Sequence, residues 1–389
     1  MTTRTPLPPP DQTLPELGVL LGADAPVVLE TALGIQLESV RATHVRYEPG
    51  RSVTATFKGI TAGAASPVTL AAHAGKGLPT GTAIVGDGDS RIAVWQFPDD
   101  PRLPGLPHAI RPELLRNLLS EVGADHRITR VRTRSYRARR RAVIEVTTER
   151  HRLFVKVVRP SKIRELQAAH TMVADHVRVP RSLGYSEELG IAVLETIPGI
   201  TVREAIEAGE ESLPSGTELT SLLDRIPLLP ERRPSLSERL AVHQRFLSTI
   251  LPEAAPQLAR IAEAVEPAQP EPVVAAHNDF HSAQVMVSFG RVSGLVDIDT
   301  IGQGSRVDDY AMWLGHLHTL SLGAGGQAYA AYGARVLTEF ESSMGSQQLR
   351  PRIAAAVTAF ATAPFRSQQP NWPAATIRHL GAAEEWINR

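Results

Sequence analysis

Short hydrophobic runs dominate the first half of the chain, and hydrophobic residues at helical spacing dominate the second half. The runs have the length of β-strands and are separated by Gly, Pro or polar turns. They occur at 52–57, 68–72, 92–97, 142–147, 153–158, 182–185 and 191–196. Because polar turns divide the last four runs into two pairs, we expect two β-hairpins there.

Helical spacing first appears at 111–122 and at 161–176, where Ser161 is suited to cap the helix. A short double strand is expected within 273–299, with Gly290 at its turn. A β-rich half followed by a helical half predicts an α+β protein with two lobes. The helices expected in the second half span 201–208, 236–250, 253–265, 308–322, 327–340, 349–362 and 374–387.

A weak internal similarity links residues 47–51 with residues 136–140. Each segment precedes an apolar run, and the two share only their first residue, Tyr, and their last residue, Arg. Two explanations are open from the sequence: an internal duplication, or a coincidence between two strand starts.

Composition narrows the classes of protein to consider. With 389 residues, 42% hydrophobic and 21% charged, the chain has the size of two or three domains and the composition of a soluble globular protein. The formal net charge is zero, so neither nucleic acid nor a membrane surface is an expected partner. The absence of Cys excludes disulfides and thiolate catalysis and fits a cytoplasmic location. No apolar run approaches the roughly 18 residues that a membrane-spanning helix needs.

The segment 277–284, His-Asn-Asp-Phe-His-Ser-Ala-Gln, concentrates side chains that carry chemistry. Asp279 follows a buried strand expected at 273–276, where a strand meets a loop. Its carboxylate is suited to accept the proton of a hydroxyl that attacks a phosphate. Gln284 is close enough in sequence to reach the same space, and its carbonyl oxygen suits Mg²⁺.

Asp297 lies among apolar residues, so we expect it to be partly buried and to need a partner such as a metal ion. Asp299 would be a spare ligand on the same face if the strand continues. In the alternative interpretation both aspartates cap the following loop. A different pattern, the alternation of His277, Asp279 and His281, would suit zinc or a non-haem metal on a continuous strand. Because this spacing is short and no Cys or third His is near, a structural hydrogen bond is the preferred role of His277.

Two basic features precede this segment. Lys156 lies inside an apolar strand, where a lysine usually points to solvent, and Glu165 on the next helix is a candidate ion-pair partner. The segment 130–141 contains seven arginines. Three interpretations of it stay open: nucleic-acid binding, a solvated hairpin, or contact of Arg139 or Arg140 with nucleotide phosphates.

The order of these segments resembles the aminoglycoside phosphotransferase family, which shares the fold of eukaryotic protein kinases. The resemblance covers roughly residues 130–389 and is nearest to the maltokinase-like branch. The matching segments are the lysine strand at 154–156, the hinge at 193–199, the catalytic loop at 277–284, the hairpin end Val296-Asp297 and the segment 304–311, which corresponds to Gly-Asp-Pro-x-x-Asp-Leu-Ala.

The resemblance implies a bilobal protein-kinase-like enzyme that uses ATP and Mg²⁺ to phosphorylate a hydroxyl of a small acceptor, such as a sugar, an aminosugar or an aminoglycoside-like compound. It implies an N-terminal α/β cap domain at 14–125, an N-lobe at 126–198 and a helical C-lobe at 199–389. The proline cluster near the N-terminus separately predicts a disordered leader at 1–13. The implied roles are Asp279 as catalytic base; Gln284 and Asp297 as Mg²⁺ ligands; Lys156, Glu165, Glu195, Ile197 and Arg140 at the nucleotide; and Asp309 as a brace for the catalytic loop.

The chain departs from the family pattern at three places. Gln284 stands where Asn is usual, which keeps the oxygen but adds a methylene group. Ser305 stands where Asp is usual, and the turn before Ala142 has no Gly, so its backbone approaches phosphates less closely than a Gly-rich loop. The glycine-free turn and Gln284 motivate an alternative function, a nucleotide-binding pseudokinase that acts as a regulatory module.

Overall fold

The computed structural model describes residues 5–63, 66–88, 90–124, 126–265 and 272–388. These residues form two compact units. The first unit comprises residues 1–167, 182–196 and 364–373, and the second comprises 168–181, 197–363 and 374–389. The domain boundaries expected from the sequence stay predictions, and residues 1–4 of the expected leader lie outside the described residues.

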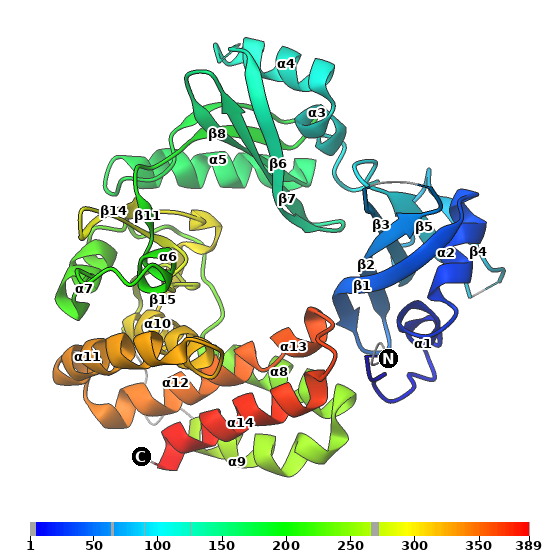
Figure 1. Ribbon diagram of the computed structural model, residues 1–389. Helices are drawn as coiled ribbons and strands as arrows, with labels where there is room; N and C mark the ends of the chain where they lie inside the picture. Colours follow the sequence, from blue (N-terminus) through cyan, green and yellow to red (C-terminus); the bar gives the residue numbers. More distant parts are fainter. Residues whose placement is uncertain (1–4, 64–65, 89, 125, 266–271, 389) are drawn as a thin grey trace. The chain divides into compact units, whose positions relative to one another are not determined.

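The first unit begins with an antiparallel sheet, drawn in blue in Figure 1. The helices α1 (Glu16–Leu21) and α2 (Ala25–Leu33) contact its strands. The runs predicted at 52–57, 68–72 and 92–97 are confirmed as strands. In spatial order the strands are β1 (Leu37–Glu48), β2 (Ser52–Thr61), β3 (Val68–Gly75), β5 (Ile92–Gln96) and β4 (Ala83–Val85).

The second sheet of this unit, teal to green in Figure 1, contains both predicted hairpins. In spatial order its strands are β6 (Ile128–Arg137), β7 (Arg141–Thr148), β8 (Arg152–Val158), β10 (Ile191–Glu195) and β9 (Ser182–Ser186). One face packs its apolar side chains against α3 (Leu106–Ile110) and α4 (Pro112–Glu121), and the other packs against α5 (Pro160–Ala174).

The prediction that Ser161 caps α5 is wrong. The helix begins one residue earlier, at Pro160, so Ser161 lies within its first turn. Proline is favoured at that first position because its fixed φ suits the helix and its missing N–H would have no partner there.

The two sheets have the same connectivity. Their strands follow the orders β1-β2-β3-β5-β4 and β6-β7-β8-β10-β9, and β1 and β6 each carry two register irregularities against the neighbouring strand. The central strands β5 and β10 both begin with Ile-Ala-Val. A sequence of the form Asp-x-x-Leu-Pro precedes each sheet, at 11–15 and at 100–104.

Each sheet also closes its first hairpin with the same set of hydrogen bonds, which we call the latch. In the first sheet the Asp11 carboxylate accepts hydrogen bonds from the Tyr47 hydroxyl and the Gly50 amide, both at 2.7 Å. Gly50 has a φ of 66°, a left-handed conformation that glycine adopts without steric cost.

In the second sheet, the Asp100 carboxylate accepts hydrogen bonds from the Tyr136 hydroxyl at 2.8 Å and from the Arg139 amide at 2.7 Å. Arg139 has a φ of 64°, so it takes the conformation of its counterpart in the first latch. Each latch residue of the second sheet lies 89 positions after its counterpart in the first sheet, for example Asp100 after Asp11. A coincidence between two strand starts does not account for this agreement, so the structure supports an internal duplication.

The second unit is mainly helical, and several helix starts follow directly from the sequence. Capping boxes begin α6, α7 and α8, with Ser or Thr at the N-cap and Glu three residues later. The helices predicted at 201–208, 236–250, 253–265, 308–322, 327–340, 349–362 and 374–387 are all confirmed. The sequence prediction missed α7, although Ser215 and Glu218 form its capping box.

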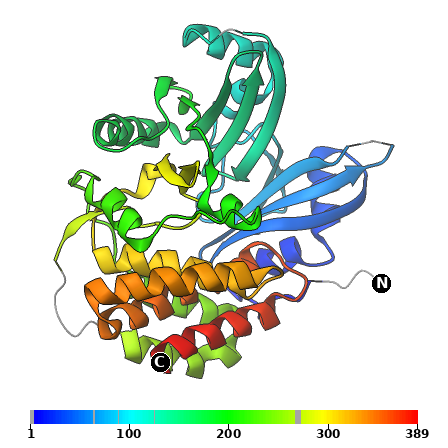
Figure 2. The ribbon, with the colours of Figure 1, turned by 60° about the vertical axis from the view of Figure 1, so that its left-hand side comes forward.

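Helix α10 is buried along most of its length and contacts α11 and α12, which lie side by side in Figures 1 and 2. The helices are α6 (Val202–Glu207), α7 (Gly216–Asp224), α8 (Leu236–Ile250), α9 (Ala255–Val265), α10 (Arg306–Ser321), α11 (Gly326–Met344), α12 (Ser346–Phe360), α13 (Ala363–Arg366) and α14 (Trp372–Asn388), with 3₁₀ turns η1 (Pro252–Ala254) and η2 (Ile298–Thr300). The short strands are β11 (Ile200–Thr201), β12 (Val274–Ala276), β13 (Val285–Ser288), β14 (Arg291–Leu295) and β15 (Gly302–Gly304).

Candidate active site

The predicted catalytic loop leaves β12, which pairs with β15. The strand starts at Val274, one residue later than expected. Val273 is exposed, although a buried residue was expected there. After Ala276 the backbone turns, and Asn278 adopts a positive φ of 63°. The Asn278 side chain donates hydrogen bonds to the carbonyl oxygens of Ala276 and Thr300, at 3.1 and 3.2 Å. The sequence did not point to Asn278, which holds the loop in this turn.

Asp309 on α10 holds the same loop through hydrogen bonds to its backbone. Its two carboxylate oxygens accept the backbone N–H groups of His277 and Asn278, each at 2.8 Å. Burial raises the pKa of Asp309 to about 7, although these two hydrogen bonds act in the opposite direction. The bracing role expected for Asp309 is therefore present in the structure.

The structure brings Asp279, Gln284 and Asp297 into one connected group through His281. The His281 Nε2 atom lies 4.0 Å from the Asp279 Oδ1 atom and 3.2 Å from the Gln284 Nε2 atom. Gln284 Nε2 in turn lies 3.5 Å from Asp297 Oδ2. The Asp279 side chain is 37% exposed, whereas Gln284 is buried. An accessible carboxylate beside a buried amide and a second carboxylate offers the hard oxygen donors that Mg²⁺ prefers.

Asp297 lies just beyond β14, which ends at Leu295. It is partly buried, as expected, and its φ of 52° places it in the left-handed region that non-glycine residues seldom adopt. Asp299 belongs to η2 and so does not share a strand face with Asp297. The strand does not continue to Asp299, because the backbone at Asp297 leaves the extended conformation for a left-handed one.

The alternating His-Asp-His interpretation also fails, since these residues lie on a turn and not on a continuous strand. Among the described residues no group of three or more His, Asp or Glu side chains is arranged to hold a metal ion. His277 is fully buried, with Nε2 3.4 Å from the Val296 carbonyl oxygen, and burial lowers its pKa to about 4. This contact agrees with the structural role preferred for His277.

Two residues that the sequence did not single out, Ser282 in the catalytic loop and His316 on α10, help to hold the loop in place. The rings of His281 and His316 stack with centroids 4.4 Å apart. The Ser282 hydroxyl lies 3.1 Å from His316 Nδ1. Burial lowers the pKa of both histidines, with His281 at about 4, so both rings are neutral near pH 7. Their positions 35 residues apart in sequence gave no signal of this contact.

Lys156 belongs to the first unit and lies on β8, between Val143 of β7 and Ala192 of β10. It is only 6% exposed, so the expectation of a solvent-facing lysine is wrong. Its side of the sheet is the one that packs against α5. In the first sheet, His73 pairs with Thr54, the counterpart of Val143, so His73 occupies the position of Lys156.

The remaining predicted nucleotide residues are distributed over both units. Glu165 on α5 accepts a hydrogen bond from the Lys162 Nζ atom at 2.6 Å. Glu195 is the last residue of β10, and Ile197 is buried in the second unit beside Gly294. Arg140 lies in the turn between β6 and β7 and is exposed. Their assignment to the nucleotide stays a prediction.

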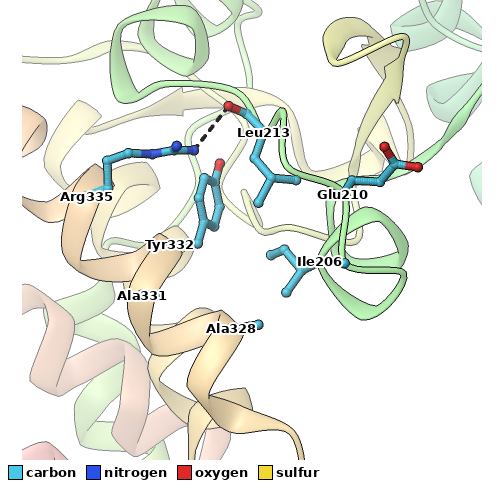
Figure 3. Close-up of a pocket in the computed structure, with 8 residues that line it drawn as sticks. Ile206, Glu210, Leu213, Ala328, Ala331, Tyr332 and Arg335 are labelled. Atoms are coloured by element: carbon cyan, nitrogen blue, oxygen red, sulfur yellow. Dashed lines mark hydrogen bonds between the residues drawn. The ribbon is translucent and has the colours of Figure 1, made fainter.

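The second unit also contains a cavity of about 320 Å³ between α6, the segment after it and one face of α11 (Figure 3). The Arg335 guanidinium donates to the Leu213 carbonyl oxygen at 3.1 Å and lies over the Tyr332 ring, 5.2 Å from its centroid. Helix α6 starts beside the catalytic loop, because the Arg203 amide donates to the Ser282 carbonyl oxygen at 2.9 Å. The lining residues are Ile206, Gly209, Glu210, Leu213, Ala328, Ala331, Tyr332 and Arg335.

No helix in the described part of the chain combines the length and the hydrophobicity needed to cross a membrane.

Comparisons with known proteins agree with this architecture. No curated protein matches the sequence. Among solved structures, aminoglycoside phosphotransferase APH(4)-Ia is 11% identical with a TM-score of 0.52, over 71% of this chain and 97% of that one. A thermostable mutant of APH(4)-Ia in a ternary complex with ADP and hygromycin B is 11% identical with a TM-score of 0.51, over 70% of this chain and 97% of that one. ADP-bound APH(2'')-Ib is 13% identical with a TM-score of 0.50, over 72% of this chain and 99% of that one.

These likenesses show a shared fold, the α+β protein-kinase-like arrangement that we expected. Nearness to the maltokinase-like branch stays a prediction. The model of the phosphotransferase enzyme family (APH) matches residues 131–345, which is more than half of the chain. The chain belongs to the phosphotransferase enzyme family.

Proposed function

We propose that the protein transfers a phosphoryl group from ATP to a hydroxyl of a small molecule, with a sugar, an aminosugar or an aminoglycoside-like compound as acceptor. The observation that carries the proposal is the loop at Asp279, which presents an accessible carboxylate on a backbone fixed by Asp309. A fixed carboxylate can accept the hydroxyl proton and orient the attacking oxygen. Solved relatives in complex with ADP, AMP-PNP and hygromycin B support this class of reaction.

The remaining roles follow from the same proposal. Mg²⁺ would be held by the Asp297 carboxylate and the Gln284 side-chain oxygen, two side chains that lie together in the structure, where Gln284 Nε2 is 3.5 Å from Asp297 Oδ2. The ion would neutralise charge on the phosphates. Lys156 would contact the α- and β-phosphates, the role that the resemblance implies for the lysine of this strand, and its position on β8 is compatible with that role. The backbone at Glu195 and Ile197 would hold the adenine.

Replacing Asp279 tests the catalytic role. Asp279→Ala should lower turnover by about 10²- to 10⁴-fold, the contribution typical of a general base, while nucleotide affinity is largely kept. ATP turnover over a panel of sugars and aminoglycosides measures the first, and a thermal shift with ATP and Mg²⁺ measures the second. The matched control is Asp175→Asn, an exposed carboxylate of the same unit. Near-normal turnover by Asp279→Ala would remove the assignment.

The same assays separate the enzyme from the pseudokinase. The turn between β6 and β7 lacks Gly, which motivates the alternative. Nucleotide binding without turnover on a broad acceptor panel would favour a regulatory module. Asp297→Ala should weaken nucleotide binding only when Mg²⁺ is present, and an equal loss without Mg²⁺ would argue against a metal ligand.

For the acceptor, we propose that the cavity beside α6 holds part of the molecule. Its walls are mostly apolar, and Glu210 offers a carboxylate for an amino group. Glu210→Gln should raise the KM for amino-bearing acceptors several-fold, with kcat and the KM for ATP unchanged, because one surface ion pair contributes about 1 kcal/mol or less. An unchanged acceptor KM would place the acceptor elsewhere.

A further inference from the structure

His281 belongs to the catalytic loop, yet the proposed function gives its side chain no role. Its backbone carbonyl oxygen accepts a hydrogen bond from the Gln284 backbone N–H at 2.9 Å, so residues 281–284 form a turn that brings the two side chains together. The His281 Nε2 atom lies 3.2 Å from the Gln284 Nε2 atom. The orientation of the Gln284 side-chain amide therefore depends on what the His281 ring offers it.

The hydrogen bond at the other ring nitrogen determines the tautomer of His281. The backbone N–H of Ala283 donates to His281 Nδ1 at 3.3 Å, so Nδ1 carries a lone pair and no proton. Because a neutral imidazole has one N–H and one acceptor nitrogen, the proton is on Nε2. The ring stacks on His316, with centroids 4.4 Å apart, and this contact holds its plane. His281 therefore presents an N–H donor to the side chain of Gln284.

The side-chain amide of Gln284 can meet this donor in two orientations. With its nitrogen toward His281, as in the structure, two donors face each other, and the same nitrogen lies 3.5 Å from the Asp297 Oδ2 acceptor. Rotation by half a turn about the last side-chain bond exchanges nitrogen and oxygen, and this torsion is broad and roughly two-fold. The oxygen then accepts from His281 Nε2–H and lies beside the Asp297 carboxylate.

The second orientation of the amide is the one that suits a cation. Two oxygen atoms side by side, one of them on a charged carboxylate, repel each other unless positive charge is present, and together they form the hard donor pair that Mg²⁺ prefers. Gln284 also has one more rotatable bond than the Asn that is usual in the family, so ordering its oxygen costs more side-chain entropy. A hydrogen bond from His281 offsets that cost.

We propose that His281 is a positioning residue, which holds the side-chain oxygen of Gln284 toward Mg²⁺ through its Nε2–H. The inference rests on the proposed function, because that function places Mg²⁺ beside Gln284 and Asp297. Hydrogen bonds from outside the ligand set fix the orientation of metal ligands and typically contribute about 10- to 100-fold to metal affinity. The alternative acceptor for the same N–H is Asp279, but its Oδ1 atom lies 4.0 Å from Nε2, beyond hydrogen-bond distance.

Calorimetry of ADP binding to the full chain over a series of Mg²⁺ concentrations measures the metal requirement without turnover. His281→Asn and His281→Gln form a matched pair, because both remove the ring, but Asn offers its amide nitrogen near the place of Nδ1 and Gln near that of Nε2. His281→Asn should raise the Mg²⁺ concentration that gives half of the metal-dependent gain in ADP affinity about tenfold, whereas His281→Gln should raise it about twofold or less. Equal increases in the two variants would contradict donation from Nε2.

Replacing Gln284 by Glu separates orientation of the amide from a general structural effect. A carboxylate presents an oxygen in both orientations, so it does not need His281 to turn it. In the Gln284→Glu background, His281→Asn should therefore change the Mg²⁺ requirement by about twofold or less, against about tenfold in the wild-type background. A role in folding, or in holding Asp279, would give the same ratio in both backgrounds and would overturn the proposal.

Nitrogen-15 NMR of the histidine rings tests the tautomer without any ligand. The signal that disappears in His281→Gln belongs to His281, and at about pH 7.5 it should show a protonated Nε2 and an unprotonated Nδ1. A ring protonated on Nδ1 would overturn the proposal, whatever the enzyme does. A wild-type affinity for ADP that Mg²⁺ does not change would remove the metal role proposed for Gln284 and Asp297, and this inference with it. An unchanged Mg²⁺ requirement in His281→Asn would remove this inference alone.

Discussion

The two sheets of the first unit share strand order, register irregularities and latch, yet they differ at the positions that carry chemistry. The second sheet has Lys156 on its third strand, followed directly by α5. The first has His73 at the corresponding position, and the described segment 76–82 that follows contains no helix. Alternating apolar residues are enough to preserve the fold, whereas a few polar positions decide what each copy can bind.

The latch itself shows how surroundings alter the same chemistry. Burial acts to raise the pKa of Asp11, but hydrogen bonds from Tyr47, Gly50 and Thr13 outweigh it and lower the pKa to about 2. Burial raises the pKa of Asp100 and outweighs a similar set of hydrogen bonds. The difference follows from burial, because Asp100 is buried whereas Asp11 is partly exposed.

The largest expected difference between the copies concerns activity. Lys156→Ala should reduce ATP turnover by about 10²-fold or more, the usual cost of removing one charge-stabilising donor. His73→Ala should leave kcat within a factor of about two, because the proposed chemistry uses the other copy, while lowering thermal stability. Steady-state kinetics beside thermal unfolding checks both. Comparable activity losses in the two variants would mean that the first copy takes part in catalysis.

The next difference concerns stability. Asp100→Ala would leave the Tyr136 hydroxyl and two backbone N–H groups without their acceptor in a buried place, at a cost of about 3 kcal/mol. Asp11→Ala should cost only about 1 kcal/mol, because its latch is partly exposed and water can replace the carboxylate. Denaturant unfolding measures both values, and the reverse order would show that depth does not set the strength of the latch.

The third difference concerns pH. Since the folded-state pKa of Asp11 lies below its usual 3.8, its stabilisation is complete above about pH 4 and is lost as the pH falls toward 2. For Asp100, whose folded-state pKa is raised, the stabilisation is present at low pH and is lost as the pH rises through that pKa. Asp11→Asn should thus cost about 1 kcal/mol at pH 7, after allowance for screening, and almost nothing near pH 2. Unfolding curves across this range test it; a pH-independent cost would contradict the assignment.

The smallest effect is expected from the tyrosines. Tyr136→Phe removes the hydroxyl that joins Trp95 to Asp100, and Tyr47→Phe removes the hydrogen bond to Asp11. We expect Tyr136→Phe to lower the free energy of unfolding by about 1–2 kcal/mol and Tyr47→Phe to lower it by about 1 kcal/mol. Tyr136→Phe should also increase hydrogen exchange in the turn between β6 and β7, whereas Tyr47→Phe should not.

From the sequence alone came most strands of the two hairpins, the longer helices of the second half and the candidate loop at 277–284, because periodicity acts over a few neighbouring residues. The long edge strands β1 and β6, the short helices α1, α2 and α3, and α7 were missed. The sequence also contained the first trace of the duplication, in two Tyr and two Arg residues. The shared strand order, the two latches and the Asp-x-x-Leu-Pro and Ile-Ala-Val segments that they align made that trace convincing.

Only the tertiary structure decided the burial of Lys156, the left-handed backbone at Asp297 and the contact of His281 with His316. The physical reason is common to all three. Burial, backbone conformation and ring contacts depend on which segments meet after folding, and partners tens of residues apart leave no local periodic signal in the sequence.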